Sequence, residues 1–250
     1  MERTRTQTIR DFILDQAAMN PRGLARRIAE AYGISRQAAN RHLDLLVDAG
    51  LLEETGQTRA RTYCLKRTSS LSREVRVTPV LSPGRLWEDH IAAILAGDRP
   101  AVRDLCRGGF NELVRNATEH ANASWIQFSF AQNARDIDIT ISDDGAGIFH
   151  ALREPLGAAT PREAAEMAAN LANARAADSP AAKLVLLARN FHAFTVRSAE
   201  VVLRFDRDAD RWSVSGDDAP RKGTTVSFRL RRASLGAARA HMRSGTAMTR

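Results

Sequence analysis

The stretch FNELVRNATEH, residues 110–120, sets a carboxylate and a carboxamide one helical turn apart. Leu113 and Ala117 follow helical spacing in the same stretch, and side chains four positions apart on a helix are neighbours on one face. Glu112 and Asn116 therefore project together. Two such polar groups can cap or satisfy a neighbouring loop, or they can act together in a binding or catalytic site.

Two further segments favour a site. ISDDGAGIF, residues 141–149, places Asp143 at the end of a strand with glycines after it, and KGTTVSF, residues 222–228, places Gly-Thr at the start of a later strand. In this order, the three segments resemble the N-box, the first glycine box and the Gly-Thr strand of the GHKL ATPase family. That family includes gyrase, MutL, heat-shock chaperone ATPases, histidine-kinase catalytic domains and anti-sigma-factor kinases. The resemblance covers roughly residues 85–232.

The resemblance implies ATP or ADP as ligand, with Mg²⁺. Asn116 would supply its side-chain oxygen to Mg²⁺, a hard cation that prefers oxygen ligands and bridges to phosphates. Glu112 would orient or deprotonate the group that attacks the γ-phosphate. Asp143 would accept a hydrogen bond from the exocyclic amine of adenine. Gly145 and Gly147 would let the backbone approach the base closely, and Thr224 would place a hydroxyl near the same base.

The second glycine-rich segment of the family has no counterpart in this chain. The position in this chain where that segment should fall is ADSPAAKLVLLARNF, residues 177–191, which contains no glycine. In the family, the backbone amides of that segment wrap the phosphates next to a helix N-terminus. Ser179 can still cap the helix, and Lys183 can offer a charge to a phosphate. We therefore expect nucleotide binding, whereas turnover as a weak ATPase is left open. Asp144 is interpreted as a solvated turn residue.

Helices and strands of the second half must hold these residues in place. Residues 125–130 and 136–142 alternate apolar and polar side chains, which predicts an antiparallel hairpin with one buried face. We expect helices over 86–95 and on to about 123, with an Ala-rich helical region to about 190. Three strand-like runs close this half, at 194–205, 211–216 and 223–230. Helices on one face of an antiparallel sheet make an α+β sandwich.

The first 67 residues carry a different pattern. Helical stripes cover 3–19, 20–33 and 34–50, and two short strands follow around a polar turn. Ser35 is a good N-cap for the third helix and Gly50 stops it. The stretch GISRQAANRHLDLLVDAGLLEE, which begins at Gly33, resembles the recognition-helix region of bacterial winged-helix regulators. That resemblance implies double-stranded DNA as a partner.

In such regulators the third helix enters the major groove and the hairpin wing follows the backbone. Arg59 and Arg61 alternate with small residues on the wing, so both are expected to point the same way, towards phosphate or the minor groove. The alternative is that these arginines form a solvated face of a protein-interaction unit. Reading two half-sites favours a homodimer. The side chains expected in the groove are Ser35, Arg36, Gln37, Asn40 and Arg41.

Composition sets the class of protein. A hydrophobic content of 44% and a charged content of 26% are ordinary for a soluble globular chain. The formal charge of +8 permits a polyanionic partner such as nucleic acid. Cys64 and Cys106 lack metal-ligand spacing and fit a reduced compartment. Residues 1–10 lack the apolar core of a signal peptide, and no apolar run reaches the roughly 18 residues of a membrane span. We expect a cytoplasmic protein.

Together these patterns predict an α+β chain, with an N-terminal winged helix-turn-helix followed by a GHKL (Bergerat) α/β sandwich. The expected boundaries are 1–67 for the winged helix, 68–84 for a linker with one short strand inside it, 85–232 for the GHKL domain and 233–250 for a basic, flexible tail. The leading hypothesis is a transcriptional regulator whose nucleotide state modulates binding to DNA or to a protein partner. The alternatives are a serine protein kinase of the anti-sigma type and a pseudo-ATPase that only dimerises.

Overall fold

The computed structural model describes residues 4–57, 60–171 and 180–232, so Arg59 and the predicted tail at 233–250 lie outside the described residues. Two compact units are present. The first contains residues up to Ser70 together with Ala131–Asp136 and Arg232, and the second contains Leu71–Phe130 and Ile137–Arg231. The predicted mixed α+β class is confirmed, because each unit combines helices with a sheet.

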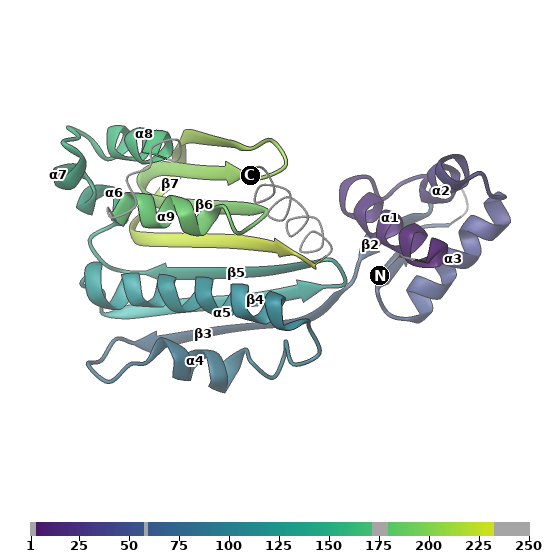
Figure 1. Ribbon diagram of the computed structural model, residues 1–250, viewed down its shortest axis with the longest axis horizontal. Helices are drawn as coiled ribbons and strands as arrows, with labels where there is room; N and C mark the ends of the chain where they lie inside the picture. The colour runs from purple at the N-terminus through teal and green to yellow at the C-terminus, as the bar shows by residue number, and fades with distance from the viewer. Residues whose placement is uncertain (1–3, 58–59, 172–179, 233–250) are drawn as a thin grey trace, which may run out of the picture. The chain divides into compact units, whose positions relative to one another are not determined.

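Three helices and a small sheet make the first unit (Figure 1). These are α1 (Arg5–Met19), α2 (Leu24–Tyr32), α3 (Arg36–Asp48) and the antiparallel pair β1 (Leu52–Thr55) and β2 (Thr62–Leu65). The Ser35 hydroxyl accepts the N–H of Ala38 at 3.1 Å and so caps α3, as predicted. Gly33 ends α2 with a φ of 62°, a left-handed conformation that glycine adopts without strain. Ile13, Ile28 and Leu43 are fully buried where the three helices meet.

A five-stranded sheet in the order β3-β4-β5-β7-β6 forms the centre of the second unit. Its strands are β3 (Arg67–Arg76), β4 (Trp125–Asn133), β5 (Asp136–Asp143), β6 (Ala193–Asp206) and β7 (Arg211–Arg231). In Figure 1, α4 (Pro83–His90) and α5 (Pro100–Arg115) lie across one face of the sheet. The remaining helices are α6 (Ile148–Ala151), α7 (Arg153–Leu156), α8 (Pro161–Leu171) and α9 (Pro180–Ala188), and α8 and α9 contact β6. Within the described residues, no helix has the length and apolar character needed to cross a bilayer.

Packing of α5 against the sheet is close enough to need a glycine. A Cβ at Gly109 would lie 2.7 Å from the Cζ atom of Phe191, whose ring stacks on that of Phe228 with centroids 4.1 Å apart. The next residue, Phe110, meets Phe128 of β4 edge-on at 5.3 Å. These contacts orient α5 and thereby set the direction in which its last turns present their side chains.

The segment 68–84, expected as a linker with one short strand inside it, does contain a strand, and that strand is longer than expected. Residues 67–76 form β3, an edge strand beside β4, and only a short connection precedes α4. Most β3 side chains are exposed, because main-chain pairing rather than apolar burial holds the strand. An apolar alternation was therefore absent from the sequence, and Ser and Pro dominated the pattern.

The runs 211–216 and 223–230, predicted as separate strands, both belong to β7. Pairing with β6 jumps from Ala199 opposite Arg221 to Val201 opposite Gly216, so residues 217–220 bulge out of the ladder. Asp217 stabilises the bulge by accepting the N–H of Ala219 at 3.2 Å and an Arg197 guanidinium hydrogen at 3.3 Å. The bulge lets the two runs keep one strand direction.

Candidate functional site

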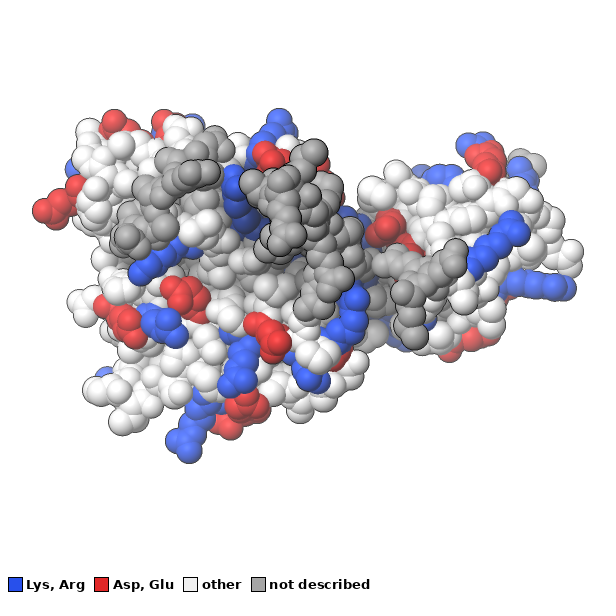
Figure 2. Space-filling model, in the orientation of Figure 1, with Lys and Arg blue, Asp and Glu red and all other residues white. Residues whose placement is uncertain are grey.

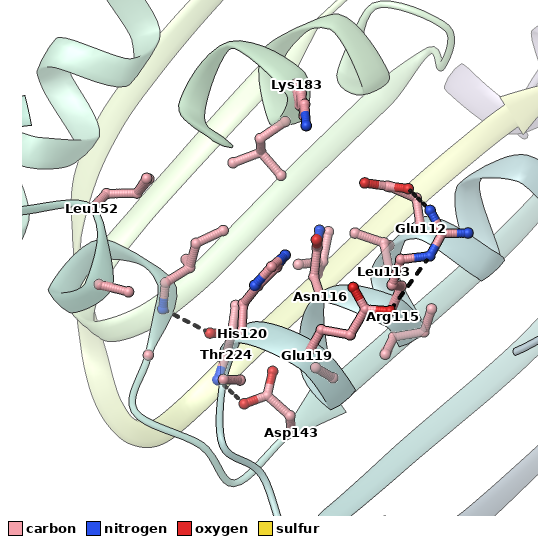
Figure 3. A pocket seen from close by; sticks show the side chains of 18 of the residues that line it. Glu112, Leu113, Arg115, Asn116, Glu119, His120, Asp143, Leu152, Lys183 and Thr224 are labelled. Carbon is pink, nitrogen blue, oxygen red and sulfur yellow. Dashed lines mark hydrogen bonds and ion pairs between the residues drawn. The ribbon is translucent and has the colours of Figure 1, made fainter. Parts of the chain in front are cut away.

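A cavity of about 470 Å³ opens in the second unit between the end of α5, the glycine turn after β5, and helices α6, α7 and α9 (Figure 3). Its volume lies within the range typical of small-molecule sites. Its lining includes apolar side chains, among them Ile148, Leu152 and Leu184. Of the residues predicted to bind nucleotide, the structure brings all but Gly145 to the cavity wall: Glu112, Asn116, Asp143, Gly147, Lys183 and Thr224.

Asp143 ends β5 at the base of the cavity. Its Oδ1 atom accepts the N–H of Gly145 at 2.9 Å and the N–H of Thr224 at 3.3 Å. The other carboxylate oxygen points into the cavity (Figure 3). Burial raises the pKa of the Asp143 carboxyl, the two N–H donors lower it in part, and the neighbouring Asp144 raises it further. The carboxyl is thus fixed in orientation and presents one acceptor to whatever occupies the cavity.

Thr224, on β7, is bonded both to Asp143 at the end of β5 and to Ile148 at the start of α6. Its Oγ1 atom accepts the N–H of Ile148 at 2.9 Å, which leaves the hydroxyl hydrogen able to donate. Gly223 precedes it with a φ of 82°, and a Cβ there would lie 1.9 Å from the carbonyl oxygen of Asp143. Gly223 is therefore a site residue that our assignment from sequence missed. The Gly-Thr pair in the sequence could have indicated Gly223, but the prediction assigns a role at the nucleotide only to Thr224.

The two predicted glycines have different roles. Gly147 lines the cavity with a φ of 89°, where other residues would be strained. Gly145, expected to let the backbone approach the base, packs instead against the end of the preceding helix. A Cβ on it would lie 2.2 Å from the carbonyl oxygen of Ala121, which also accepts the N–H of Ala146 at 2.8 Å.

Helix α5 ends at Arg115, and the chain continues as a π-helical turn, η2 (Asn116–His120). The sequence predicted one regular helix here. Single π-helical turns are rare and often occur at functional sites. Asn116 begins this turn and points into the cavity (Figure 3). The wider turn also delivers Ala121 to Gly145.

Glu112, the predicted base, is ion-paired. Its Oε2 atom lies 3.1 Å from Nη1 of Arg115, and Nε of the same arginine lies 4.0 Å from Glu119. The side chain of Glu112 is about one-third exposed, at 34%. Ion pairs this exposed contribute about 0–1 kcal/mol, so a phosphate could displace Glu112 from the arginine at little cost.

An oxygen donor of the kind that Mg²⁺ prefers lines the cavity at Asn116. No cluster of three or more His, Cys, Asp or Glu side chains that could hold a metal occurs in the described part of the chain. Mg²⁺ usually keeps several waters and binds through one or two protein oxygens plus substrate phosphates. The Asn116 amide oxygen fits such a role. Lys183, exposed on α9, points towards the cavity and supplies positive charge from the opposite wall (Figure 3).

Asp144 has a structural partner, which corrects its interpretation as a solvated turn residue. Its Oδ1 atom accepts the N–H of Ser124 at 2.7 Å and the N–H of Trp125 at 2.9 Å. The bond from Trp125 is the main reason that the pKa of Asp144 is lowered. The adjacent carboxylates therefore differ in role, because Asp144 anchors the start of β4 while Asp143 faces the cavity.

The predicted DNA-contacting residues of the first unit lie at the N-terminal end of α3. Ser35 uses its hydroxyl as the helix cap, and Asn40 is half-buried. On the face of the molecule seen in Figure 2, basic and acidic side chains are intermingled, so the net charge is not gathered into one patch there. The exposed members of the predicted set on α3 are Arg36, Gln37 and Arg41.

Arg61 lies directly before β2, between the two strands of the predicted wing. β2 begins at Thr62, and Arg61 precedes it with its Nε atom 2.9 Å from Glu54 and Nη1 donating to the Tyr63 hydroxyl at 3.3 Å. The expectation that it points the same way as Arg59 concerns a residue outside the described part. Contact with phosphate would require Arg61 to exchange Glu54 for the DNA backbone.

Comparison with known proteins identifies no family. No protein-family model matches the chain, and no curated protein matches it. One similar solved structure is the N-terminal domain of a DNA repair protein, with 18% identity over 44% of this chain and 31% of that chain and a TM-score of 0.25. A candidate IclR transcriptional regulator from Silicibacter sp. TM1040 has 12% identity, covers 94% of this chain and 89% of its own, and has a TM-score of 0.25. A candidate GntR-family transcriptional regulator has 13% identity over 89% and 90%, with a TM-score of 0.19. Superpositions this poor carry no weight for fold or function.

Proposed function

We propose that the chain is a DNA-binding regulator in which a GHKL-type sandwich binds ATP or ADP with Mg²⁺, and in which a winged-helix unit contacts double-stranded DNA. The observation that carries the nucleotide half is the geometry of Asp143. A carboxylate with one oxygen saturated by two backbone N–H groups has its second oxygen directed into a cavity of nucleotide-compatible size.

Adenine fits this acceptor better than guanine does. The adenine exocyclic amine donates to a carboxylate, whereas guanine presents a carbonyl oxygen on the corresponding edge and would face an acceptor with an acceptor. The Thr224 hydroxyl, with one lone pair occupied by Ile148, still has a hydrogen to donate to a ring nitrogen or a water. Apolar side chains in the cavity lining, such as Leu152 and Leu184, suit the face of the base.

The residues proposed to meet the phosphates favour nucleotide binding more than rapid hydrolysis. Lys183 would offer a positive charge from one wall of the cavity, and Asn116 would offer an oxygen ligand from the opposite wall to Mg²⁺ carried in with the nucleotide. Glu112 is paired with Arg115 and acts as a base only when that pair opens. We therefore place ligand binding first and treat hydrolysis through Glu112 as a slower, secondary activity.

The DNA half rests on α3. Its capped N-terminal end presents Arg36, Gln37 and Arg41 to solvent, and such long donors and amides can reach base edges in a major groove. Arg61, once released from Glu54, would contact the phosphate backbone from the wing. A homodimer that reads two half-sites, and an additional protein partner, belong to the same proposal.

Calorimetric titration tests the nucleotide half directly. We expect ADP and ATP to bind at micromolar Kd with Mg²⁺ and more weakly without it, and GDP to bind at least about tenfold more weakly, which corresponds to one unsatisfied hydrogen bond. Equal affinity for ADP and GDP would remove the role given to Asp143. For the DNA half, affinity for a labelled mixed-sequence duplex should fall steeply as salt rises. Absence of duplex binding at low salt would leave a protein-interaction unit as the explanation for the first 67 residues.

A further inference from the structure

The turn between β4 and β5 is buried in the first unit. Ala134 packs against the core cluster that contains Ile13. Arg135 and Asp136 have exposed fractions of only 7% and 3%. Nε of Arg135 donates to Oδ1 of Asp15 on α1 at 2.5 Å, and its Nη1 donates to Oδ2 of Asp136 at 3.2 Å. A hairpin turn has no need to bury charges unless they attach it to something, because unpaired buried charges are strongly unfavourable.

The end of β7 is tied to the same turn. The N–H of Arg232 donates to the carbonyl oxygen of Arg135 at 2.9 Å, and its guanidinium donates to the carbonyl of Asn133 and to the side chain of Gln132. Within the turn, Oδ1 of Asn133 accepts the N–H of Arg135 at 2.9 Å and that of Asp136 at 2.8 Å. One end of β5 and one end of β7 are therefore fixed to each other and, through Arg135, to α1.

The opposite ends of these stretches hold the cavity. β5 finishes at Asp143, and the last part of β7 starts at Thr224, which donates its N–H to that carboxylate. Over the 8 residues of β5 the distance is roughly 25 Å. Three side-chain pairs join β5 to β7 along the way: Asp138–Arg229 at 2.7 Å, Thr140–Ser227 at 2.9 Å and Ser142–Thr225 at 2.9 Å.

We propose that β5 and β7, joined by these pairs, form the element that couples occupancy of the cavity to the Arg135–Asp15 bond, which attaches the β4–β5 turn to α1. The inference rests on the proposed function and names how that site is regulated. A ligand on Asp143 acts at the point where the two strands are bonded to each other. At the far end the response is two-state, because Arg135 either keeps its carboxylate partners or moves into water, and an intermediate position leaves a buried charge unpaired.

The test uses the full chain and compares Asp15→Asn and Arg135→Met with a matched control, Glu30→Gln. The control removes one carboxylate from the first unit but breaks only the exposed Arg26–Glu30 pair, whose atoms are 3.4 Å apart. Affinity for a labelled mixed-sequence duplex is measured at fixed salt with and without saturating MgADP. In wild type and Glu30→Gln, MgADP should change duplex affinity by at least about fivefold. In Asp15→Asn and Arg135→Met that ratio should fall to within about twofold of unity, with the Kd for MgADP itself unchanged. An unaltered ratio in both variants overturns the proposal.

A second measurement needs neither ligand, so it separates failure of the coupling from failure of the proposed function. If the joined strands transmit, loosening the turn with Asp15→Asn should speed amide hydrogen exchange at the cavity end, at Gly145 and Thr224, by about tenfold, the effect of losing one charge-assisted hydrogen bond. Glu30→Gln should leave both amides unchanged. Asp15 is the milder site because its carboxylate is 41% exposed, so the variant is expected to fold. Unchanged exchange in Asp15→Asn refutes the coupling whether or not the wild type binds nucleotide.

Discussion

Replacing Asp143 by Asn should weaken nucleotide binding and, at neutral pH, stabilise the unliganded fold. The amide oxygen of the asparagine must take over the hydrogen bonds from the N–H groups of Gly145 and Thr224, at 2.9 and 3.3 Å. That requirement turns the amide nitrogen towards the cavity, where a donor then faces the exocyclic amine of adenine. Loss of a hydrogen bond to a charged group amounts to about 1.5–3 kcal/mol, which is roughly a 10- to 150-fold increase in Kd.

Stability moves the other way because burial raises the pKa of the Asp143 carboxyl above its value in the unfolded chain. The folded protein therefore holds that proton more tightly, and the resulting contribution to stability is fully present below the unfolded pKa and is lost as pH rises through the folded pKa. At neutral pH the wild type contains a partly buried carboxylate that destabilises the fold. Asparagine carries no such charge, so its advantage should appear at neutral pH and disappear in acid.

Calorimetry gives the Kd for MgADP, and thermal unfolding at neutral pH and below the ordinary aspartate pKa gives the change in Tm. Asp138→Asn is the matched control, since that carboxylate lies on the same strand but does not line the cavity. Its Oδ1 atom instead pairs with Nε of Arg229, at a distance of 2.7 Å. Asp138→Asn should leave the Kd unchanged and should not raise the Tm. An unchanged Kd in Asp143→Asn, or a Tm lowered at neutral pH, would show that this carboxylate is not the partly buried ligand acceptor described above.

Three further outcomes are expected. Gly109→Ala should lower the free energy of unfolding by about 1–3 kcal/mol, because the added methyl group overpacks against the Phe191 ring. Gly108 has open space around it, so Gly108→Ala should raise the free energy of unfolding by about 0.5–1 kcal/mol. Urea unfolding measures both changes, and equal effects would contradict the packing described for α5. Asn116→Ala should bring the Kd for ADP with Mg²⁺ to the value measured without it, and a persisting Mg²⁺ effect would exclude this side chain as the oxygen ligand. Arg41→Ala should weaken duplex binding and reduce the slope of its salt dependence by about one, while an unchanged slope would place Arg41 away from phosphate.

Local order was predictable where short-range chemistry controls it. The Ser35 cap and the Gly33 stop follow from side-chain and backbone preferences that act within one turn. The alternation in β4 and β5 identified a sheet with one buried face, because every second residue there is apolar. The grouping of Glu112, Asn116, Asp143 and Thr224 around one cavity came from the order of three motifs, and their assignment to nucleotide remains a prediction.

Other features depended on partners distant in the chain. β3 is held by main-chain pairing at a sheet edge and left little apolar signal, so the sequence predicted only a short strand within a linker there. The two runs of β7 were separated because the register shift opposite Ala199 has no local signature. Glu112 pairs with Arg115, three residues further on, and spacing along the helix alone does not decide between this partner and Asn116.

By itself, the sequence determined the secondary structure that local periodicity and capping dictate, the mixed class of the chain, and the residue types from which binding of a nucleotide and DNA is predicted. Only the tertiary structure decided how those residues are used. It fixed one oxygen of Asp143 on two backbone donors, assigned Asp144 to β4, and buried Arg135 against Asp15. The physical reason is that a hydrogen bond or ion pair between residues far apart in the chain depends on how the backbone brings them together, and that geometry is a property of the whole packed fold.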